Sequence, residues 1–328
     1  MKKLFRAYYR PSDVELKELW ETATIVLDAN VLLDVYGYSA ATRESLLAAL
    51  RAFRERLWVP FQFALDFHNN RVGKILEQAS ACRDAERDLR KVLAQFRSKR
   101  KHPFVAPEVE QQLERICNEL VEGAASHERV LSSDPYVDTL TELLEGRVGN
   151  APDAEWLKRE YAAGAERFER SFPPGYLDAK KPAPERYGDY LGWKQILEYA
   201  TAQSASVVFV TDETKEDWWF VQAGKTLGPR RELVQEFIKS SSNSFVMCSV
   251  EGMLEVAQAA GTKVSAEAIA EVRERREAQI AATELKPAAP FGAGEGKPMI
   301  AVASETLKSS ARADADEASL KPPPRDED

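Results

Sequence analysis

Thr24-Ile25-Val26-Leu27-Asp28 is a short apolar run that stops at a carboxylate. Val207-Val208-Phe209-Val210-Thr211-Asp212, much later in the chain, has the same design. Consecutive β-branched and apolar residues are typical of strands that are buried on both faces, as in a parallel sheet. The carboxyl ends of parallel strands share one edge of the sheet, where open α/β folds bind their ligands. We therefore expect Asp28 and Asp212 to lie at that edge.

Helical patterns separate these runs from other strand-like segments. Residues 39–56 carry apolar side chains at helical spacing, and another helical pattern begins at Tyr187-Gly188-Asp189. Short strand-like segments occupy 57–60 and 245–248. Strands that alternate with helices predict an α/β fold, with a parallel sheet flanked by helices.

A long charged region interrupts this alternation. Residues 76–171 have apolar positions at helical spacing and few strand signals. Both ends return to the same predicted sheet, so we interpret the region as a helical insertion into an α/β core formed by 1–75 and 172–260. A C-terminal helix is expected over 261–285. The tail, 286–328, is rich in Ala, Pro, Glu, Lys and Ser, a composition typical of disorder.

The composition narrows the class of protein. The chain has 328 residues with a net charge of −8, so it lacks the global basic field of a general nucleic-acid binder. No run approaches the ~18 apolar residues of a membrane span, and no apolar stretch follows the basic N-terminus as in a signal peptide. The cysteines are three and far apart, which favours free thiols in a reducing compartment. We expect a cytoplasmic protein without membrane contact.

Four carboxylates are candidates for a metal site. Asp28 and Asp212 follow strands, whereas Asp66 and Asp189 lie on predicted helices. Converging carboxylates repel one another unless a cation binds, and oxygen ligands suit Mg²⁺ or Mn²⁺. Each residue has a plainer alternative, because an Asp can also close a turn after a strand or cap a helix. Asp34 is expected to be structural.

Together the motifs resemble those of PIN domains, a metal-dependent nuclease fold. Four segments, each with an acidic residue, carry the resemblance in the family's order: residues 25–33, 59–67, 188–194 and 210–219. The run Thr211-Asp212-Glu213-Thr214-Lys215-Glu216-Asp217-Trp218-Trp219, with the loop Pro173-Pro174-Gly175, narrows the resemblance to a bacterial PIN-like subfamily with a long helical insert.

The resemblance implies a metal centre and an activity. Asp28, Asp66, Asp189 and Asp212 would hold one or two Mg²⁺ or Mn²⁺ ions that activate water and clamp a scissile phosphate, usually in RNA. The second position is commonly Glu in this fold, and Asp66 is one methylene shorter. Asp217 is a further candidate metal ligand, and Asp178 is a similar second-tier candidate.

The function expected from the resemblance is that of a metal-dependent endonuclease, a hydrolase of phosphodiester bonds. RNA is the expected substrate and single-stranded DNA the alternative. Family habit suggests stress response or defence, with a protein partner that holds the nuclease in check, and a homodimer is left open. The competing interpretation is a catalytically inactive PIN-like scaffold that binds a partner through its insert and tail. Asp66 in place of Glu and the acidic net charge favour this alternative.

Other polar and aromatic residues near these motifs have two interpretations each. Trp218 and Trp219 could stack on bases, but packing in the core against a Gly228-Pro229 turn is preferred. Thr211 could orient a carboxylate or be a plain strand residue. Arg71 could touch phosphate or pair with an acid. The basic run 97–101 could guide an RNA backbone, with a solvated helix end as the default.

Overall fold

The computed structural model describes residues 1–2, 4–98, 105–223 and 225–284. Except for Glu284, these residues belong to one compact unit, Met1–Thr283, and the second unit is Glu284–Asp328. The predicted tail over 286–328 lies outside the described residues, as do the last three residues of the basic run 97–101.

A four-stranded parallel sheet forms the centre of the first unit. Its order is β2 (Leu57–Trp58), β1 (Thr24–Leu27), β3 (Val207–Val210) and β6 (Phe245–Cys248). The register aligns Leu27 with Val210 and Val210 with Cys248, so three strands end together. Every residue of β3 is buried, as its unbroken apolar run predicts. The predicted α/β fold with a parallel sheet is confirmed.

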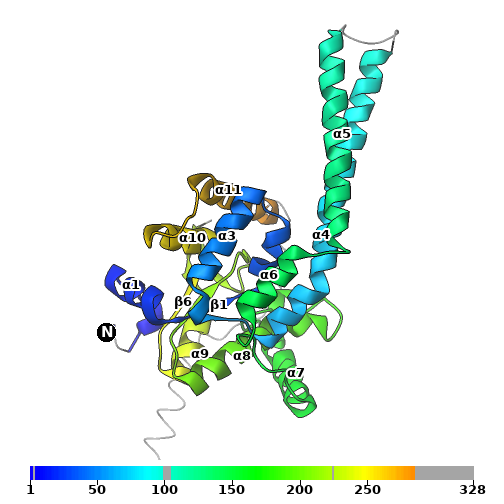
Figure 1. The fold of residues 1–328 in the computed structure, drawn as a ribbon. Helices are drawn as coiled ribbons and strands as arrows, with labels where there is room; N and C mark the ends of the chain where they lie inside the picture. The colour runs from blue at the N-terminus through cyan, green and yellow to red at the C-terminus, as the bar shows by residue number, and fades with distance from the viewer. Residues whose placement is uncertain (3, 99–104, 224, 285–328) are drawn as a thin grey trace, which may run out of the picture. The chain divides into compact units, whose positions relative to one another are not determined.

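Helices cover both faces of this sheet. Figure 1 places α3, α10 and α11 on one side of it and α8 and α9 on the other. The bounds of the helices that surround the sheet are α1 (Asp13–Thr22), α2 (Ala29–Leu33), α3 (Ala40–Ala52), α8 (Gly188–Gln203), α9 (Arg231–Ser241), α10 (Val250–Ala259) and α11 (Ala266–Glu284). Short 3₁₀ turns add η1 (Arg6–Tyr8), η2 (Asp34–Tyr36), η3 (Arg54–Arg56), η4 (Tyr176–Asp178) and η5 (Glu185–Tyr187).

A long helical hairpin leaves the sheet region. α4 (Phe61–Arg97) begins beside the sheet and runs on without a break, and α5 (Pro107–Val130) packs along it (Figure 1). Ile75, Ala79 and Leu93 of α4 are buried in this pairing or near its base. Two further helices, α6 (Pro135–Leu144) and α7 (Ala154–Glu169), lead back to the sheet. Most of the described residues of 76–171 are therefore helical, whereas 145–153 form a connection in which Val148 bridges to Val59 beside β2.

A small β-hairpin stands apart from the main sheet. β4 (Trp219–Gln222) and β5 (Lys225–Pro229) pair antiparallel, with Trp219 opposite Pro229. Gly228-Pro229 is thus part of a strand, and the expected turn there is wrong. Pro229 is tolerated because it ends the strand, where no further ladder bond is needed. In the described ranges no helix is long and apolar enough to cross a membrane.

Candidate functional site

Asp28 lies at the carboxyl end of β1 and is held by three hydrogen bonds. Its Oδ1 accepts from the backbone N–H of Ala29 at 2.6 Å, so it caps the short helix α2. Its Oδ2 accepts from Thr211 Oγ1 at 2.6 Å and from Asn30 Nδ2 at 2.8 Å. Thr211 follows β3, so this hydrogen bond joins the ends of two neighbouring strands. Asp28 therefore caps helix α2 and also forms part of the site.

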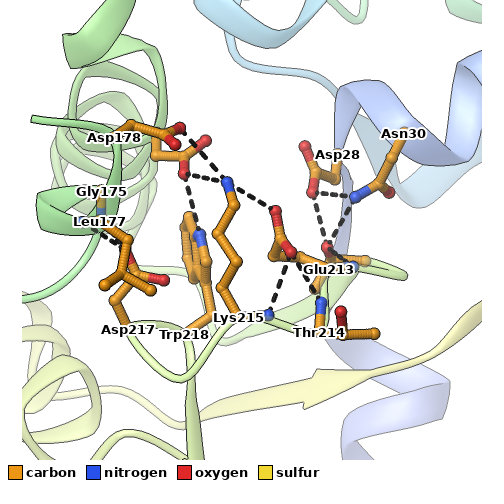
Figure 2. Close-up of polar contacts among 12 residues, drawn as sticks. Asp28, Asn30, Gly175, Leu177, Asp178, Glu213, Thr214, Lys215, Asp217 and Trp218 are labelled. Carbon is orange, nitrogen blue, oxygen red and sulfur yellow. Dashed lines mark hydrogen bonds and ion pairs between the residues drawn. The ribbon is translucent and has the colours of Figure 1, made fainter. Parts of the chain in front are cut away.

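A lysine ammonium lies among three carboxylates beside Asp28. Lys215 Nζ is 3.0 Å from Glu213 Oε2, 3.3 Å from Asp178 Oδ2 and 3.6 Å from Asp189 Oδ2. Figure 2 shows its amino group between Asp178 and Glu213, with Asp28 on the far side of Glu213. Burial lowers the pKa of Lys215, but the surrounding carboxylates more than offset this and raise it. The lysine therefore stays charged.

Burial and repulsion from neighbouring carboxylates make Asp28 and Asp189 weak acids. Burial raises the pKa of Asp28 to about 8, and the charges of Asp189 and Glu213 add to the increase. Burial also raises the pKa of Asp189, with Lys215 opposing the shift. A nearby positive charge stabilises such a cluster, because it favours the ionised forms of the carboxylates.

Asp66 approaches the same region from α4. It lies in the second turn of that helix, and its Oδ1 accepts from Gln62 Nε2 at 2.9 Å. Burial raises its pKa to about 6, and Asp189 contributes to the increase. A Cβ at Gly188, just before Asp189, would lie 3.2 Å from Asp66 Oδ2. The absence of a side chain at Gly188 thus lets the carboxylate pack against the start of α8.

Asp212 takes part in a different network from the one around Lys215. Its Oδ1 accepts from the backbone N–H of Val250 at 2.9 Å, and its Oδ2 accepts from Tyr38 at 3.4 Å. Arg275 and Arg276 lie near it, and Arg275 pairs with Asp34 at 3.0 Å. Asp212 therefore ties the end of β3 to the start of α10.

Asp217 anchors a loop. Its side chain is 0% exposed, and its Oδ2 accepts from the backbone N–H groups of Gly175 at 2.8 Å and Leu177 at 3.5 Å. Its Oδ1 is buried without a hydrogen-bond partner. Burial raises its pKa to about 6, and Asp189 adds to this. The loop that Asp217 holds carries Asp178, so the residue supports the site through the backbone.

Glu213 is a site residue that the sequence motifs do not single out, and they assign no role to Lys215. Side chains alternate in direction along an extended chain, and this alternation continues past β3. Thr211 and Glu213 face Asp28, while Asp212 between them faces Tyr38 and α10. Once the structure shows that Thr211 faces Asp28, this alternation places Glu213 on the same side.

The neighbouring residues have structural roles. Trp218 is buried and packs edge-on against Trp193, with ring centroids 6.3 Å apart, and its Nε1 donates to Asp189 Oδ2 at 3.4 Å. Arg71 pairs with Asp134 at 2.7 Å, which agrees with the alternative that it neutralises an acid. Asn30 bridges the two strand ends, because it also accepts from the backbone N–H of Asp212 at 3.2 Å.

The donor set of the site suits a hard divalent cation, since it consists of carboxylate oxygens. In the described part of the chain, however, no three His, Cys, Asp or Glu side chains converge closely enough to hold a metal ion. The space between Asp178, Asp189 and Glu213 holds the Lys215 ammonium instead. The carboxylates are thus arranged around a cation supplied by the chain itself.

The fold and the site define an α/β domain with an acidic cluster at the carboxyl edge of its sheet. A family model described as a PIN-like domain matches residues 24–233, from the first residue of β1 into α9. The chain belongs to the PIN-like domain family, and PIN-like domains are commonly nucleases. No curated protein and no solved structure matches the chain significantly. The narrower assignment to the subfamily with the Lys215–Trp219 motif stays a prediction.

Proposed function

We propose that this protein is an endonuclease that depends on Mg²⁺ or Mn²⁺ and hydrolyses phosphodiester bonds in RNA. One observation carries the proposal. Carboxylates from separate segments gather at the carboxyl edge of the parallel sheet. Asp178, Asp189 and Glu213 surround the Lys215 ammonium, and Asp28 and Asp66 lie close enough to Asp189 for its charge to raise their pKa. Membership of the PIN-like family supports the choice of phosphodiester chemistry.

The cluster has more negative charge than Lys215 can neutralise. Asp28 and Asp66 make no ion pair with it, although Asp28 lies close enough to Glu213 to feel its charge. Two carboxylates in a water-poor site interact with an energy of about 4 kcal/mol at 4 Å and an effective dielectric constant of 20. A divalent cation would relieve this repulsion. Asp28, Asp189 and Glu213 would hold it, with Asp66 assisting, once the Lys215 ammonium moves aside and the three carboxylates draw closer together than they are in this structure.

The residues of the chain have distinct roles in this proposal. Thr211 and Asn30 orient the Asp28 carboxylate by hydrogen bonds from two directions. Glu213 is fixed by the backbone N–H groups of Thr214 and Lys215, at 2.8 and 3.1 Å from its Oε1. Such preorientation matters because a loosely held ligand would move as charge develops. A bound divalent cation would polarise the scissile phosphate and activate the attacking water.

The proposal also names the substrate, a protein partner and the cellular location. RNA is proposed as the substrate and single-stranded DNA as its competitor, since neither is distinguished by carboxylates alone. A regulatory protein partner and a homodimer are proposed with the nuclease activity. A cytoplasmic location is supported by the three free cysteines, Cys82, Cys117 and Cys248.

The test is cleavage of labelled RNAs and single-stranded DNAs by the full-length protein with Mn²⁺ or with EDTA. We expect metal-dependent cleavage that is lost in Asp28→Asn and in Glu213→Gln. Asp88→Asn is the matched control, because Asp88 is exposed on α4 and pairs with Lys91 on the surface of the same helix. Its activity should equal that of the wild type. Equal cleavage by Asp28→Asn and the wild type would contradict the proposed site.

An inactive scaffold is the second candidate function. The observation that favours it is the Lys215 ammonium, which already neutralises part of the cluster. Thermal unfolding with and without Mn²⁺ separates the two functions, because a ligand that binds the folded state raises the unfolding temperature. A wild-type protein that neither cleaves nor gains stability with Mn²⁺ would favour the scaffold.

A further inference from the structure

A large cavity lies away from the carboxylate cluster, along the edge strand of the sheet. Its volume is about 1040 Å³, and β6 forms one wall. The N-terminal segment with η1 and the hairpin β4–β5 form other walls. None of the carboxylates around Lys215 lines it. The cavity therefore needs its own explanation.

Four arginines line this cavity, and within the described ranges none forms an ion pair with a carboxylate. Arg6 donates to Ser244 Oγ, and Arg10 donates to the carbonyl oxygen of Leu227 at 2.6 and 3.1 Å. The other two, Arg231 and Arg276, lie over aromatic rings. Guanidinium groups left without a carboxylate keep donors for an anion, and arginine matches phosphate with particular geometric fit.

Aromatic rings are interleaved with these cations. The Arg231 guanidinium lies 4.8 Å from the Tyr8 ring centroid and 4.2 Å from that of Phe220. The Arg276 guanidinium lies 5.7 Å from the Trp219 ring, and its Nε is buried without a partner. Rings beside a basic groove are the pattern of proteins that bind single strands, because every base has a face that can stack.

Three exposed rings lie on the N-terminal segment itself. Phe5 and Tyr8 are each 49% exposed and Tyr9 is 44% exposed. Tyr8 and Tyr9 line the cavity, and Phe5 contacts Tyr8 edge-on at 6.0 Å. Large exposed rings grouped beside cations are unusual on a surface without a ligand. They offer stacking surface next to the arginines.

Acidic residues of α1 form part of the rim. Asp13, Glu15 and Glu18 line the cavity. Glu15 is engaged, because it pairs with Lys2 at 3.3 Å and accepts from the backbone N–H of Ser12 at 2.7 Å. The cavity thus has five cationic side chains against three anionic ones, in a chain whose net charge is −8. The lining of the cavity therefore has a net positive charge, whereas the whole protein has a net negative charge.

We propose that this cavity binds single-stranded nucleic acid, with the arginines at phosphates and the N-terminal rings stacked on bases. Its role in guiding a substrate rests on the proposed nuclease function, whereas binding itself does not. Cys248 and Ser249, at the carboxyl end of β6, line one end of the cavity. Neighbouring strands lie ~4.8 Å apart, so this end is roughly 10 Å from the end of β1 and Asp28.

A second contact joins the cavity to the carboxylates. Trp219 lines the cavity, and its Nε1 donates to the carbonyl oxygen of Glu213 at 2.5 Å. A single strand of nucleic acid that leaves the cavity at the carboxyl edge of the sheet would therefore meet Glu213 and then Asp28. This continuity favours nucleic acid over an acidic peptide, which would match the arginines but has no use for the carboxylate edge.

The experiment measures binding apart from cleavage. Full-length Asp28→Asn protein in EDTA is titrated against labelled single-stranded RNA and DNA of about 15 nucleotides, within the span that such grooves bind. Arg10→Gln/Arg231→Gln in the same background tests the cavity. Arg87→Gln/Arg115→Gln, on the exposed surface of the hairpin α4–α5, is the control with the same change of charge. Melting temperatures verify that all variants fold.

The expected result has a defined size. Each lost phosphate contact lowers the slope of log K against log salt concentration by about 0.7 for single strands, so two lost contacts lower it by about 1.4. The affinity at 0.1 M salt should then fall about 25-fold in the cavity variant and stay near wild type in the control. Arg10→Lys/Arg231→Lys should keep most of the salt dependence, because it keeps both charges.

Other outcomes would overturn the inference. They are equal binding by the cavity and control variants, no single-strand binding at low salt, or binding of a polyglutamate peptide in preference to either oligonucleotide. Cleavage assays on the same arginine variants, with Asp28 restored, distinguish the two proposals. Binding without cleavage by the wild type would refute the nuclease and leave the groove intact. Cleavage unaffected by the cavity variant at every salt concentration would refute the role of the groove in guiding the substrate and leave the nuclease function standing.

Discussion

Replacement of Lys215 by methionine tests whether the site is built around a cation. Lys215 Nζ lies 3.0, 3.3 and 3.6 Å from carboxylate oxygens of Glu213, Asp178 and Asp189. Methionine has a similar length but no charge, so the variant removes the ammonium and leaves the stem. Removal of one partner from a buried ion pair costs about 3–5 kcal/mol. Lys215 is 30% exposed, so water reduces this to about 2–3 kcal/mol.

The matched control is Lys194→Met. Lys194 is 32% exposed, nearly the same as Lys215, but it makes a single surface ion pair with Glu198 at 3.9 Å. Such pairs contribute about 0–1 kcal/mol. For a domain of this size 1 kcal/mol shifts the unfolding temperature by roughly 2–4 °C. We therefore expect metal-free Lys215→Met to unfold roughly 4–12 °C below the wild type, and Lys194→Met to unfold within about 4 °C of it.

Addition of Mn²⁺ gives the decisive comparison. If the ammonium and the metal use the same oxygens, Lys215→Met should bind Mn²⁺ at least tenfold more tightly than the wild type. The variant would then gain about 1.4 kcal/mol more from saturating metal, which is roughly 3–6 °C. Differential scanning fluorimetry across a Mn²⁺ titration measures both effects. An unchanged unfolding temperature without metal, or equal gains with Mn²⁺, would refute this account of the cluster.

Three further predictions concern other parts of the fold. Burial raises the pKa of Asp28 to about 8, above its ordinary value, so the folded state holds a proton that the unfolded state has lost. The metal-free wild type should therefore lose stability as pH rises from about 4 to about 8, and Asp28→Asn should show less of this loss in urea unfolding. Asp134→Ala removes the cap of α6 and the partner of Arg71, and its free energy of unfolding should fall by about 2–4 kcal/mol without a change in Mn²⁺ response. Gly192→Ala would place a Cβ 2.0 Å from Phe63 Cε1, and the resulting overpacking should cost about 1–3 kcal/mol of unfolding free energy.

The sheet could be predicted from the sequence because its strands are unbroken apolar runs. β1 and β3 have no polar residue between Ile25 and Leu27 or between Val207 and Val210, and both are buried. The small hairpin β4–β5 could not be predicted in the same way. Its residues are partly exposed and include Gly228 and Pro229, which are signals for turns. Its pairing depends on Trp219 packing in the core, a tertiary effect that local propensity does not contain.

The sequence predicts at which edge of the sheet the candidate site lies and which strands lead to it. It does not predict the direction of each side chain there. The sequence places carboxylates after β1 and β3, where the structure also has them. It does not say which of two adjacent acids, Asp212 or Glu213, turns toward Asp28. That choice follows from the alternation of side chains and from the hydrogen bond that Thr211 donates to Asp28 Oδ2.

The alternation at the end of β3 gives this short segment two functions. Thr211 and Glu213 contribute to the cluster around Lys215, while Asp212 accepts from the backbone N–H of Val250 and contacts Tyr38 on the other side. A substitution at Asp212 should therefore act on the junction of β3 with α10, and a substitution at Glu213 on the charge of the site. Since both residues are acidic and adjacent, only the structure distinguishes a residue that holds the sheet edge in place from one that faces the acidic cluster.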